Sequence, residues 1–548
     1  MLPLPRSLEL GETLIFVDSV QEILLDVPQD FSGKSGRLGG GYVDLSFQAW
    51  RALADLFADD LERCGRVRPP IRAEQEASSL DQAAGYQITF RYQASVGDGQ
   101  GAEEAYRIKV EPNSILVEAS HPQGAFYATR SLLQLLLNGC SVGTVVEDQP
   151  RYGWRGAHLD VSRHYYPVSF IKKFIDWLAL LKLNVFHWHL TDDQGWRIEI
   201  DAFPRLIEVA SKRNSSVPLS AGYYSKAEVR EIVDYARERY VEVIPEIELP
   251  GHAVATLAAY PELACVAKNY AVETNWGIFK DVYCAGSTQV FEFLDTVLEE
   301  VIELFPSRYV HIGGDEVPKE RWRECTKCQQ RLLDEQLANE EELQSWFVSR
   351  MSRFLSERGR QLVGWDEILE GGLAEGATVM SWRGTEGGVK AAQMGHDVVM
   401  SPTSHCYLDY KQSDDEDEPG AWFAPALPLE DVYAYEPTPK ELSAREAEHI
   451  LGVQGNIWTE RMPTEAQVEF MAFPRLCAIA EVGWSSDEKN FADFQQRLKK
   501  YCELLDIFGL RYRGSSEARP LIPTEEEKEQ HRRAMIDRQK SQSVAAYS

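Results

Sequence analysis

The feature that most constrains the fold is a regular alternation of segments that begins at Arg155. From there, short apolar segments alternate with amphipathic segments of helical period, which is typical of βα units around a parallel sheet. Eight strands with seven intervening segments predict an α/β fold, a (β/α)8 TIM barrel. A doubly wound sheet is the alternative, but no GxGxxG motif follows a predicted strand. The predicted strands are 156–162, 185–191, 242–248, 309–315, 362–368, 378–382, 397–402 and 450–455.

Helix signals lie between many of these strands. Between the first two strands, Phe170, Phe174 and Trp177 fall along one stripe, which predicts a helix with one buried face. Before the third strand, Ser225 and Glu228 have the spacing of a capping box, which predicts the start of another helix.

The chain of 548 residues exceeds one typical domain, so we expect a large domain and a smaller one. We predict an N-terminal α+β support domain at 1–150 and the barrel at 151–515. The remainder, 516–548, is highly charged with few apolar residues, and it predicts a frayed helix or a disordered tail. The acidic run at 414–418 is interpreted as a solvated insertion.

The N-terminal region combines strand patterns with one helix. Residues 85–92 and 106–112 have β-rich, partly alternating patterns, and 114–120 follows a Pro-Asn turn signal. These three strands are predicted to form a meander. Residues 124–138 have apolar side chains spaced for one buried helical face. We interpret this small domain as structural support.

The charge balance limits the partners of the protein. Lys and Arg number 57 and Asp and Glu number 86, which gives a net charge of −29. Such a surface repels nucleic acid and anionic membranes, so we expect neither as a partner. No stretch reaches the ~18 apolar residues of a membrane span. The first residues lack a basic start followed by an apolar run, so no signal peptide is evident and a cytoplasmic location is predicted. The oligomeric state stays open.

The cysteines and histidines raise the question of a metal. The nine cysteines are spread over the chain, and Cys325 and Cys328 form a CxxC motif. Without a second nearby pair, two ordinary thiols or a disulfide are favoured over zinc. His187 and His189 would share one face of a strand, but the apolar alternation around them favours barrel packing over metal binding. These residues therefore predict no metal site. No organic cofactor is predicted either.

Unusual polar and aromatic residues recur where the predicted strands end. In such a barrel the active site lies at the carboxyl ends of the strands, so these residues are expected to meet. Carboxylates serve as general acids, and indole rings stack on sugar faces, so the chemistry suggested is glycoside hydrolysis. The residues are Asp192, Asp193, Glu246, Glu248, His252, Asp315, Glu316, Trp365, Asp366, Glu367, Trp382, Arg383, Trp458 and Glu460.

The adjacent pair Asp315 and Glu316 carries most weight. Neighbouring residues on a regular strand point to opposite faces, so both serve one site only where the strand gives way to a loop. Gly313 and Gly314 permit that distortion. Partial burial and neighbouring negative charge would favour the protonated form of Glu316, as a general acid needs. A solvated acidic pair after a strand is the alternative.

Two further residues are open to more than one interpretation. His252 alone would be a core histidine, but the carboxylates at neighbouring strand ends favour a role in holding an acid in place. Arg155 lies just before the first strand and would by itself be a surface arginine. A fixed guanidinium can, however, bond two sugar hydroxyls at once, which suits recognition of a terminal residue.

Taken together, these motifs resemble glycoside hydrolase family 20, the β-N-acetylhexosaminidases. The likeness runs from about residue 110 to 510. HIGGDE, RGAHLDVSRH and HWHLTDDQGW are its most specific parts. The matching stretches are WRGAHLDVSRHYYP, FHWHLTDDQGWRIEI, PEIELPGH, HIGGDEVP, GWDEI, SWRG, YLD, IWTE and FPRLCAIAEVGW.

The resemblance implies a role for each matching residue. The acidic pair falls on Asp315 and Glu316, and the arginine that grips the sugar falls on Arg155. The aspartate and histidine that support the acid fall on Asp192 and His252. The groups that hold the acetamido group and the sugar hydroxyls are implied to be Trp365, Trp382, Trp458, Tyr407, Asp409 and Glu460.

The family also implies a mechanism, a retaining exo-hydrolysis of terminal β-linked N-acetylhexosamine in glycans. It resembles the substrate-assisted exception, in which the acetamido oxygen of the substrate replaces a protein nucleophile. Glu316 would protonate the leaving oxygen and then activate water, while Asp315 and Tyr407 stabilise an oxazolinium-like charge. One departure is Glu248, where many relatives have aspartate, so the details of this subsite differ.

Two rival functions stay open at this point. One is a glycosidase that uses two protein carboxylates, and the other is a non-catalytic glycan-binding barrel. The intact Asp315, Glu316 and Tyr407 argue against the second. Neither gluco nor galacto preference, nor the natural linkage, follows from the sequence.

Overall fold

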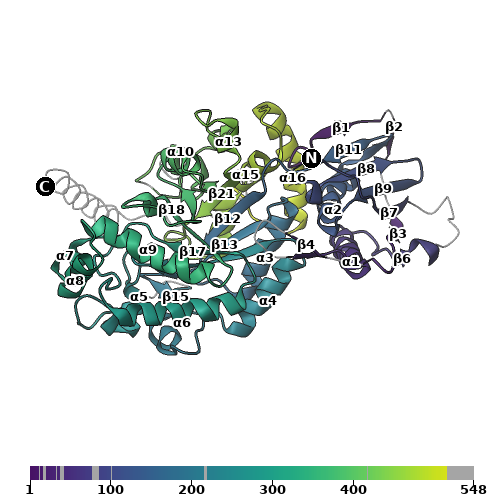
Figure 1. Cartoon of the computed structure of the whole chain (residues 1–548). Helices are drawn as coiled ribbons and strands as arrows, with labels where there is room; N and C mark the ends of the chain where they lie inside the picture. Colours follow the sequence, from purple (N-terminus) through teal and green to yellow (C-terminus); the bar gives the residue numbers. More distant parts are fainter. Residues whose placement is uncertain are drawn as a thin grey trace.

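The computed structural model describes residues 1–11, 13–15, 20–31, 34–36, 42–76, 86–99, 101–214, 219–415, 418–421 and 423–514. A smaller N-terminal domain lies beside a larger barrel domain (Figure 1). The predicted tail at 516–548 falls outside the described residues, as does part of the acidic run at 414–418.

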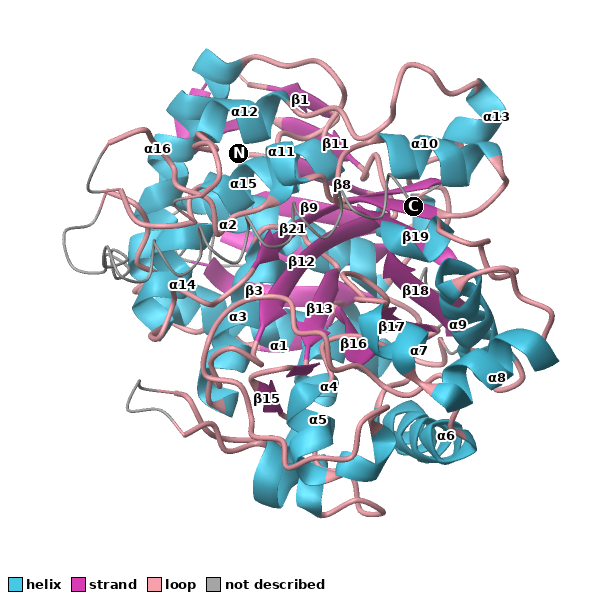
Figure 2. Ribbon diagram, turned by 90° about the vertical axis from the view of Figure 1, so that its left-hand side faces the viewer, coloured by secondary structure: helices cyan, strands magenta, loops and turns pink. Residues whose placement is uncertain are grey.

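The larger domain is a closed barrel of eight parallel strands. It closes between the first and last strands, where Arg155 lies opposite Val453. Each predicted strand overlaps one of the eight, so the (β/α)8 prediction is confirmed, and helices surround the strands (Figure 2). In order, the strands are β12 (Trp154–Asp160), β13 (Val185–His189), β16 (Glu242–Leu249), β17 (Tyr309–Gly313), β18 (Gln361–Trp365), β19 (Thr378–Ser381), β20 (Val398–Met400) and β21 (Ile450–Ile457).

The two barrel helices that the sequence signals predicted are both present. Phe170, Phe174 and Trp177 are buried on one face of α3, and the predicted capping box is present at Ser225 and Glu228 before α4. This capping box satisfies backbone N–H groups that have no partner within the first turn of α4. The longer helices of the barrel domain are α3 (Val168–Leu180), α4 (Lys226–Arg237), α6 (Thr288–Leu304), α9 (Glu340–Ser356), α10 (Glu386–Gln393), α14 (Glu465–Ala472), α15 (Arg475–Trp484) and α16 (Phe491–Ile507).

Short elements fill the connections that follow the barrel strands. Because these connections leave the carboxyl ends of the strands, they build the rim on which a TIM barrel carries its functional side chains. The elements are β14 (Thr191–Asp192), β15 (Gly195–Trp196), α5 (Val254–Ala259), α7 (Glu320–Glu324), α8 (Thr326–Asp334), α11 (Thr403–Cys406), α12 (Leu429–Ala434) and α13 (Ala444–Ala447).

The N-terminal domain contains a seven-stranded sheet in the order β1-β11-β8-β9-β7-β3-β6, with helices α1 and α2 packed together against it. The predicted meander is wrong. The Pro-Asn turn joins β8 and β9 as an antiparallel hairpin, but β7 pairs with β9 in parallel. Alternation of apolar and polar residues in the sequence identifies which segments form strands, but it does not identify which strands pair with each other. The elements are β1 (Ser7–Glu9), β3 (Val20–Asp26), β6 (Ile71–Ala73), β7 (Tyr86–Tyr92), β8 (Tyr106–Val110), β9 (Ser114–Ala119), β11 (Val145–Asp148), α1 (Phe47–Arg63) and α2 (Pro122–Asn138).

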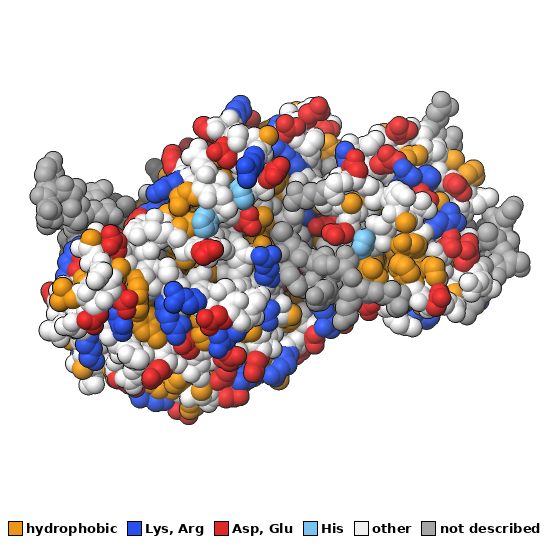
Figure 3. Space-filling view, viewed as in Figure 1, with side chains coloured by type: hydrophobic (Ala, Val, Ile, Leu, Met, Phe, Trp, Pro, Cys, Tyr) orange, Lys and Arg blue, Asp and Glu red, His pale blue; other side chains and the backbone are white. Residues whose placement is uncertain are grey.

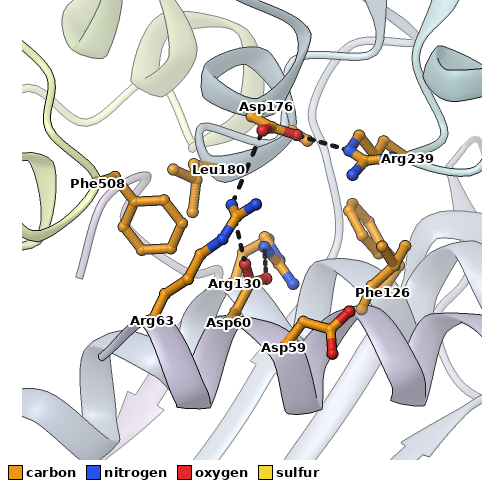
Figure 4. A pocket seen from close by; sticks show the side chains of 11 residues that line it. Asp59, Asp60, Arg63, Phe126, Arg130, Asp176, Leu180, Arg239 and Phe508 are labelled. Carbon is orange, nitrogen blue, oxygen red and sulfur yellow. Dashed lines mark hydrogen bonds and ion pairs between the residues drawn. The ribbon is translucent and has the colours of Figure 1, made fainter. Parts of the chain in front are cut away.

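A small cavity of about 50 Å³ lies where α1 and α2 meet the outer helices of the barrel (Figure 4). Most of its charged side chains pair with one another. Arg130 is 2.7 Å from Asp60, Arg239 is 2.6 Å from Asp176, and Arg63 lies 3.8 Å from both aspartates. This cavity therefore belongs to the domain junction, not to the rim of the barrel.

The surface does not carry its negative charge in one place. On the face in Figure 3, acidic and basic side chains intermix over both domains. Among the described residues, no helix has the length and apolar character needed to cross a membrane.

Candidate active site

The pair Asp315 and Glu316 lies where β17 ends and the backbone leaves the strand direction. Gly313 and Gly314 have φ angles of 66° and 87°, and Glu316 has a φ of 48°. Glycine adopts such angles readily, whereas a glutamate there is strained and is held by its surroundings. The distortion that the sequence predicted is present. Both carboxylates face one histidine, with Asp315 Oδ2 and Glu316 Oε2 at 3.6 and 3.8 Å from His252 Nε2.

A glycine is also required at position 313 because the Glu248 side chain occupies the space that a Cβ there would take. A Cβ at Gly313 would lie 1.7 Å from Glu248 Oε2. Glu248 is buried, and within the described part of the chain neither of its carboxylate oxygens has a hydrogen-bond partner. Burial, followed by the charges of Asp315 and Glu246, raises the pKa of Glu248 well above its ordinary value. Its side chain is therefore a neutral carboxylic acid beside the acidic pair.

His252 connects the acidic pair to the connection after β13. Its Nδ1 lies 3.1 Å from Asp193 Oδ2 and 3.3 Å from Asp192 Oδ1. Asp193 also accepts the backbone N–H of Val254 at 2.9 Å, which fixes the connection that carries the histidine. His252 has a positive φ of 47°, so both it and Glu316 occupy strained backbone positions of the kind found at functional sites.

A chain of buried side chains leads from the barrel interior to this histidine. Glu246 Oε2 accepts a hydrogen bond from His189 Nδ1 at 2.6 Å. His189 Nε2 donates to Asp192 Oδ2 at 3.1 Å, and Asp192 reaches His252. Glu246, His189 and Asp192 are all buried. The sequence placed Asp192, Glu246 and His252 at the strand ends of the site, but it assigned His189, which links Glu246 to Asp192, to barrel packing.

Negatively and positively charged side chains alternate along this series of hydrogen-bonded residues. Burial opposes charge on His189, but the carboxylates of Glu246 and Asp192 raise its pKa to about 10. Burial likewise opposes ionisation of Asp192, yet Arg163 and His252 hold its pKa well below the ordinary value. For His252, Asp192, Asp193 and Asp315 outweigh burial and raise the pKa well above its usual range. His252 is therefore an imidazolium that faces the acidic pair.

Two further interior histidines lie against the same glutamate. His187 Nε2 is 3.0 Å from Glu246 Oε2, and His311 Nδ1 is 2.8 Å from Glu246 Oε1. Trp365 Nε1 donates to the same Oε1 at 2.9 Å. Burial lowers the pKa of His187 to about 4, so this ring is neutral. Glu246 thus organises the layer of side chains that closes the barrel beneath the site.

Four aromatic rings line the region above that layer. Trp365 and Trp458 lie 5.8 Å apart between ring centroids, and Trp382 stacks on Tyr407 at 6.0 Å and 21°. Tyr407 lies 6.5 Å from Trp458, so the four rings form one continuous wall. These are the four aromatic residues that the resemblance implied around an acetamido group, and the fold brings them together from β18, β19, β21 and the α11 segment.

Acidic side chains fix the outermost ring. Trp382 Nε1 donates to Glu367 Oε2 at 2.8 Å, and its backbone N–H donates to Asp366 Oδ2 at 3.1 Å. Arg383 donates to Asp366 at 2.6 Å. Burial, followed by the charge of Asp315, raises the pKa of Glu367 well above its ordinary value. The acidic residues at the end of β18 therefore position a wall of the site.

Asp409 and Glu460 form a second acidic group at the rim. Asp409 is half-buried, and desolvation and the charge of Glu460 raise its pKa well above the ordinary value. Arg163 lies beside this group, with Nη2 at 4.0 Å from Glu460 Oε1 and 2.8 Å from Asp192 Oδ2. Its guanidinium also lies 5.1 Å from the ring centre of Trp458.

The assignment of Arg155 to the site is wrong. Arg155 lies near the amino end of β12, at the opposite end of the barrel from the acidic pair, and its side chain is fully buried. It donates to the backbone carbonyls of Lys182 at 2.9 Å and Tyr152 at 2.7 Å, and it pairs with Glu104 of the N-terminal domain. The arginine at the rim is Arg163, which follows the carboxyl end of the same strand.

The sequence contained a signal for the residues that were missed. Arg163 and Asp160 both lie at the carboxyl end of β12, where polar residues were expected to gather, in the stretch HLDVSRH. Asp160 Oδ1 accepts the backbone N–H of Arg163 at 3.0 Å, and Oδ2 accepts the backbone N–H and the hydroxyl of Thr459, both at 3.1 Å. Asp160 therefore joins the first and last strands of the barrel beneath the rim.

Several polar atoms of the site have no partner within the protein. In the part of the chain that the structure describes, these include both oxygens of Glu248, Asp315 Oδ1 and Asp409 Oδ1. Buried polar atoms are normally hydrogen-bonded, so a cluster of unpaired acceptors beside an aromatic wall indicates a site for a polar ligand.

Family models match both domains of the chain. The model of glycosyl hydrolase family 20, catalytic domain, matches residues 152–487, and that of domain 2 of the same family matches residues 43–149. A β-hexosaminidase of Porphyromonas gingivalis is 48% identical over 86% of this chain and 61% of its own length. Another from Vibrio furnissii is 36% identical over 70% of this chain and 65% of its own length. The chain thus spans less than two thirds of either relative.

Solved structures extend the likeness to both domains. An exo-β-N-acetylglucosaminidase of Vibrio harveyi, in complex with N-acetylglucosamine, has a TM-score of 0.80 at 30% identity, over 94% of this chain and 78% of its own. A mutant β-hexosaminidase of Streptomyces plicatus, in complex with its product GlcNAc, has a TM-score of 0.77 at 29% identity, over 94% and 96%. With a family match over more than half of its length, this chain belongs to glycosyl hydrolase family 20.

Proposed function

We propose that the protein is a retaining exo-β-N-acetylhexosaminidase that hydrolyses terminal, non-reducing β-linked N-acetylglucosamine or N-acetylgalactosamine of glycans. The observation that carries the proposal is one acidic pair beside a charged histidine, at the same end of the barrel as a wall of four aromatic rings. His252 lies within 4 Å of both carboxylates, and Trp365, Trp382, Tyr407 and Trp458 form the wall. The residues match those that the family resemblance implied, except for the arginine.

In the first step, the acetamido oxygen of the substrate attacks the anomeric carbon while Glu316 protonates the departing glycosidic oxygen. Asp315 accepts the acetamido N–H and stabilises the positive charge that develops on the oxazolinium ring, and the Tyr407 hydroxyl donates to the acetamido oxygen. The ring charge exists only beyond the ground state, so Asp315 acts mainly on the transition state.

In the second step, Glu316 removes a proton from water, which opens the oxazolinium ring with retained configuration. Glu316 must therefore lose and regain a proton in each cycle. Its carboxylate lies 3.8 Å from the imidazole ring of His252, and it follows Asp315 directly in the chain.

Recognition of the terminal sugar is assigned to the rim. Asp409 and Glu460 accept hydrogen bonds from sugar hydroxyls, and Arg163 takes the role that the sequence gave to Arg155. An arginine fork suits two adjacent hydroxyls, and Arg163 is already oriented by Asp160 and Asp192. All steps use groups of the chain and of the substrate.

The first experiment measures hydrolysis of nitrophenyl β-glycosides. We expect turnover of the β-N-acetylglucosaminide, turnover of the galacto epimer, and almost none of the plain β-glucoside. Comparable rates on the glucoside would instead indicate a glycosidase with two protein carboxylates. No turnover of any member would favour a non-catalytic glycan-binding barrel.

A second experiment tests the assisting group itself. Fluorine atoms on the acetyl methyl group withdraw electrons from the acetamido oxygen, so kcat should fall steadily from the acetyl to the trifluoroacetyl substrate. A kcat that does not respond to fluorination would exclude attack by this oxygen. Product analysis of a β-linked oligosaccharide adds the test of exo action, since monosaccharide should be released from the non-reducing end alone.

A further inference from the structure

Four cysteines meet beside the loops that carry the catalytic candidates. Cys265 and Cys284 lie in the connection after β16, and Cys325 and Cys328 lie in the connection after β17. The Sγ atoms of Cys265 and Cys328, of Cys284 and Cys325, and of Cys284 and Cys328 are each 3.7 Å apart. The four sulfur atoms all lie within 4.8 Å of one another. The expectation that the CxxC motif lacks a second pair is wrong, because residues distant in the sequence complete it.

We propose that these four cysteines bind one zinc ion in a structural site. In a tetrahedral site with zinc–sulfur bonds of about 2.3 Å, the sulfur atoms lie about 3.8 Å apart. The three observed sulfur–sulfur distances of 3.7 Å agree with this value. Four thiolates in a tetrahedral arrangement are the typical ligands of structural zinc.

Paired disulfides explain the arrangement less well. All nine cysteines of the chain are described, and none is in a disulfide. Cys284 lies at the same distance from Cys325 as from Cys328, and Cys328 also contacts Cys265 at that distance. The contacts therefore single out no pair, whereas a shared central ion places all four sulfur atoms alike.

The backbone brings the two loops unusually close at this point. A Cβ on Gly286 would lie 2.1 Å from the carbonyl carbon of Lys327, so only glycine permits the approach. Trp322 Nε1 donates to the carbonyl oxygen of Tyr283 at 2.9 Å, which joins the loops a second time. The backbone N–H of Gly286 donates to the Cys284 sulfur. Such hydrogen bonds to ligand atoms are usual around a metal.

The N-terminus of α8 lies at the cluster. Cys325 is the N-cap of α8, a helix of nine residues, and Cys328 lies in its first turn. The partial positive charge of a helix N-terminus stabilises a thiolate. Cys284, Cys325 and Cys328 are buried and Cys265 is half-buried, so the site is shielded from solvent.

The location of the proposed zinc site indicates its structural role. The connection after β16 carries His252, and the connection after β17 carries Asp315 and Glu316, so one ion would hold the two loops together. The distance between these two loops determines how closely His252 approaches Asp315 and Glu316. The metal site itself does not depend on the proposed function, because its ligands contact none of these three side chains in the described interactions.

The test begins with metal analysis of the full chain, purified without chelator from cells grown with added zinc chloride. We expect about one zinc per chain, and X-ray absorption at the zinc edge should show four sulfur atoms at about 2.3 Å. Cys325→Ser and Cys265→Ser should lose most of the zinc. Cys64→Ser, which changes a half-buried cysteine outside the cluster, should retain it.

A count of thiols after unfolding with chelator separates the alternatives. Zinc with nine reactive thiols supports the site, since all nine cysteines are then reduced. A zinc-free protein with nine thiols would overturn the proposal in favour of packed thiols, and a reduced count would overturn it in favour of disulfides. Iron in place of zinc would overturn the choice of metal. If the variants fail to fold, the metal content and absorption spectrum of the unmodified protein still decide.

Discussion

The two ends of the barrel both contain buried charged groups, but they use them differently. At the amino end, Arg155 pairs with Glu104, and Lys182 Nζ lies 2.9 Å from Asp148 Oδ2. Trp484 Nε1 donates to the other oxygen of Asp148 at 2.9 Å. Every polar atom of the Arg155, Lys182 and Asp148 side chains has a protein partner there.

At the carboxyl end, acidic groups outnumber the basic groups, and several acceptors have no partner in the described chain. Glu248, Asp315 and Asp409 each contribute such an atom. The comparison teaches that a buried charge is not by itself a mark of function. A fully paired network joins the two domains, whereas an incompletely paired one is open to a ligand.

Matched carboxylate-to-amide changes at the two ends should give the largest contrast. We expect Glu316→Gln to lower kcat by roughly 10²–10⁴-fold, the usual contribution of a general acid, and most for substrates with poor leaving groups. Glu104→Gln makes the same chemical change beside Arg155, so it should alter the melting temperature and leave kcat near normal. Steady-state kinetics and a thermal melt on both variants make the comparison. A Glu316→Gln enzyme that turns over natural oligosaccharides at a near-normal rate would remove Glu316 from its role.

The next contrast concerns the aspartates. Asp315→Asn retains the size of the side chain but removes the charge that opposes the oxazolinium ring, so kcat should fall roughly 10²–10³-fold with a smaller change in KM. Binding of a thiazoline mimic of the intermediate should weaken as well. Asp148→Asn should instead weaken a buried ion pair, whose complete loss costs about 3–5 kcal/mol, without affecting kcat of the folded enzyme. An unchanged kcat in Asp315→Asn with a lowered melting temperature would make this residue a loop cap.

The two arginines provide a third and smaller contrast. Loss of a charge-assisted hydrogen bond costs about 1.5–3 kcal/mol, so Arg163→Lys should lower kcat/KM by roughly 10–100-fold. Lysine retains the charge but not the fork. Arg155→Lys should lower the melting temperature and leave kcat/KM unchanged. The reverse pattern, with the kinetic loss in Arg155→Lys, would restore Arg155 to the site.

These contrasts show what the sequence could and could not provide. Strand period and the polar strand ends predicted the eight barrel strands and the gathering of Asp315, Glu316, His252 and the three tryptophans, because the period fixes where each strand ends. Tyr407 was placed by the family resemblance alone. The same rule would have selected Arg163, which follows β12, over Arg155, which lies at the amino end of β12. Motif likeness without attention to strand direction selected the wrong arginine.

Contacts between distant segments were beyond reach for a physical reason. Periodicity reports which face of an element is buried, but not which element covers it. The parallel pairing of β7 with β9 was therefore missed, as was the meeting of Cys265 and Cys284 with the CxxC motif. The inner chain from Glu246 to His189 was also missed, because inward-pointing residues of neighbouring strands meet only once the barrel has closed.

The smallest expected effect concerns Glu248, whose carboxyl group is held neutral at the carboxyl end of the barrel. Its pKa is raised in the folded protein, so between its unfolded value of about 4.3 and that raised value the folded chain retains a proton that the unfolded chain has released. The free energy of unfolding then falls as pH rises through this window, by up to about 1.4 kcal/mol per pH unit. Gln has the shape of the neutral acid and does not titrate. The free energy of unfolding of Glu248→Gln should therefore not show this fall with rising pH.

Urea unfolding of both proteins at pH 5, 6 and 7 measures the difference directly, since the other carboxylates cancel in the comparison. The stability of Glu248→Gln relative to the unmodified protein should rise across this range, while kcat stays within about threefold because a neutral group replaces a neutral group. The slope should become shallower when Asp315→Asn is the common background, as the Asp315 charge is one cause of the raised pKa. A difference that is flat or falls with pH would mean that Glu248 is ionised in the folded protein, and the raised pKa would then be wrong.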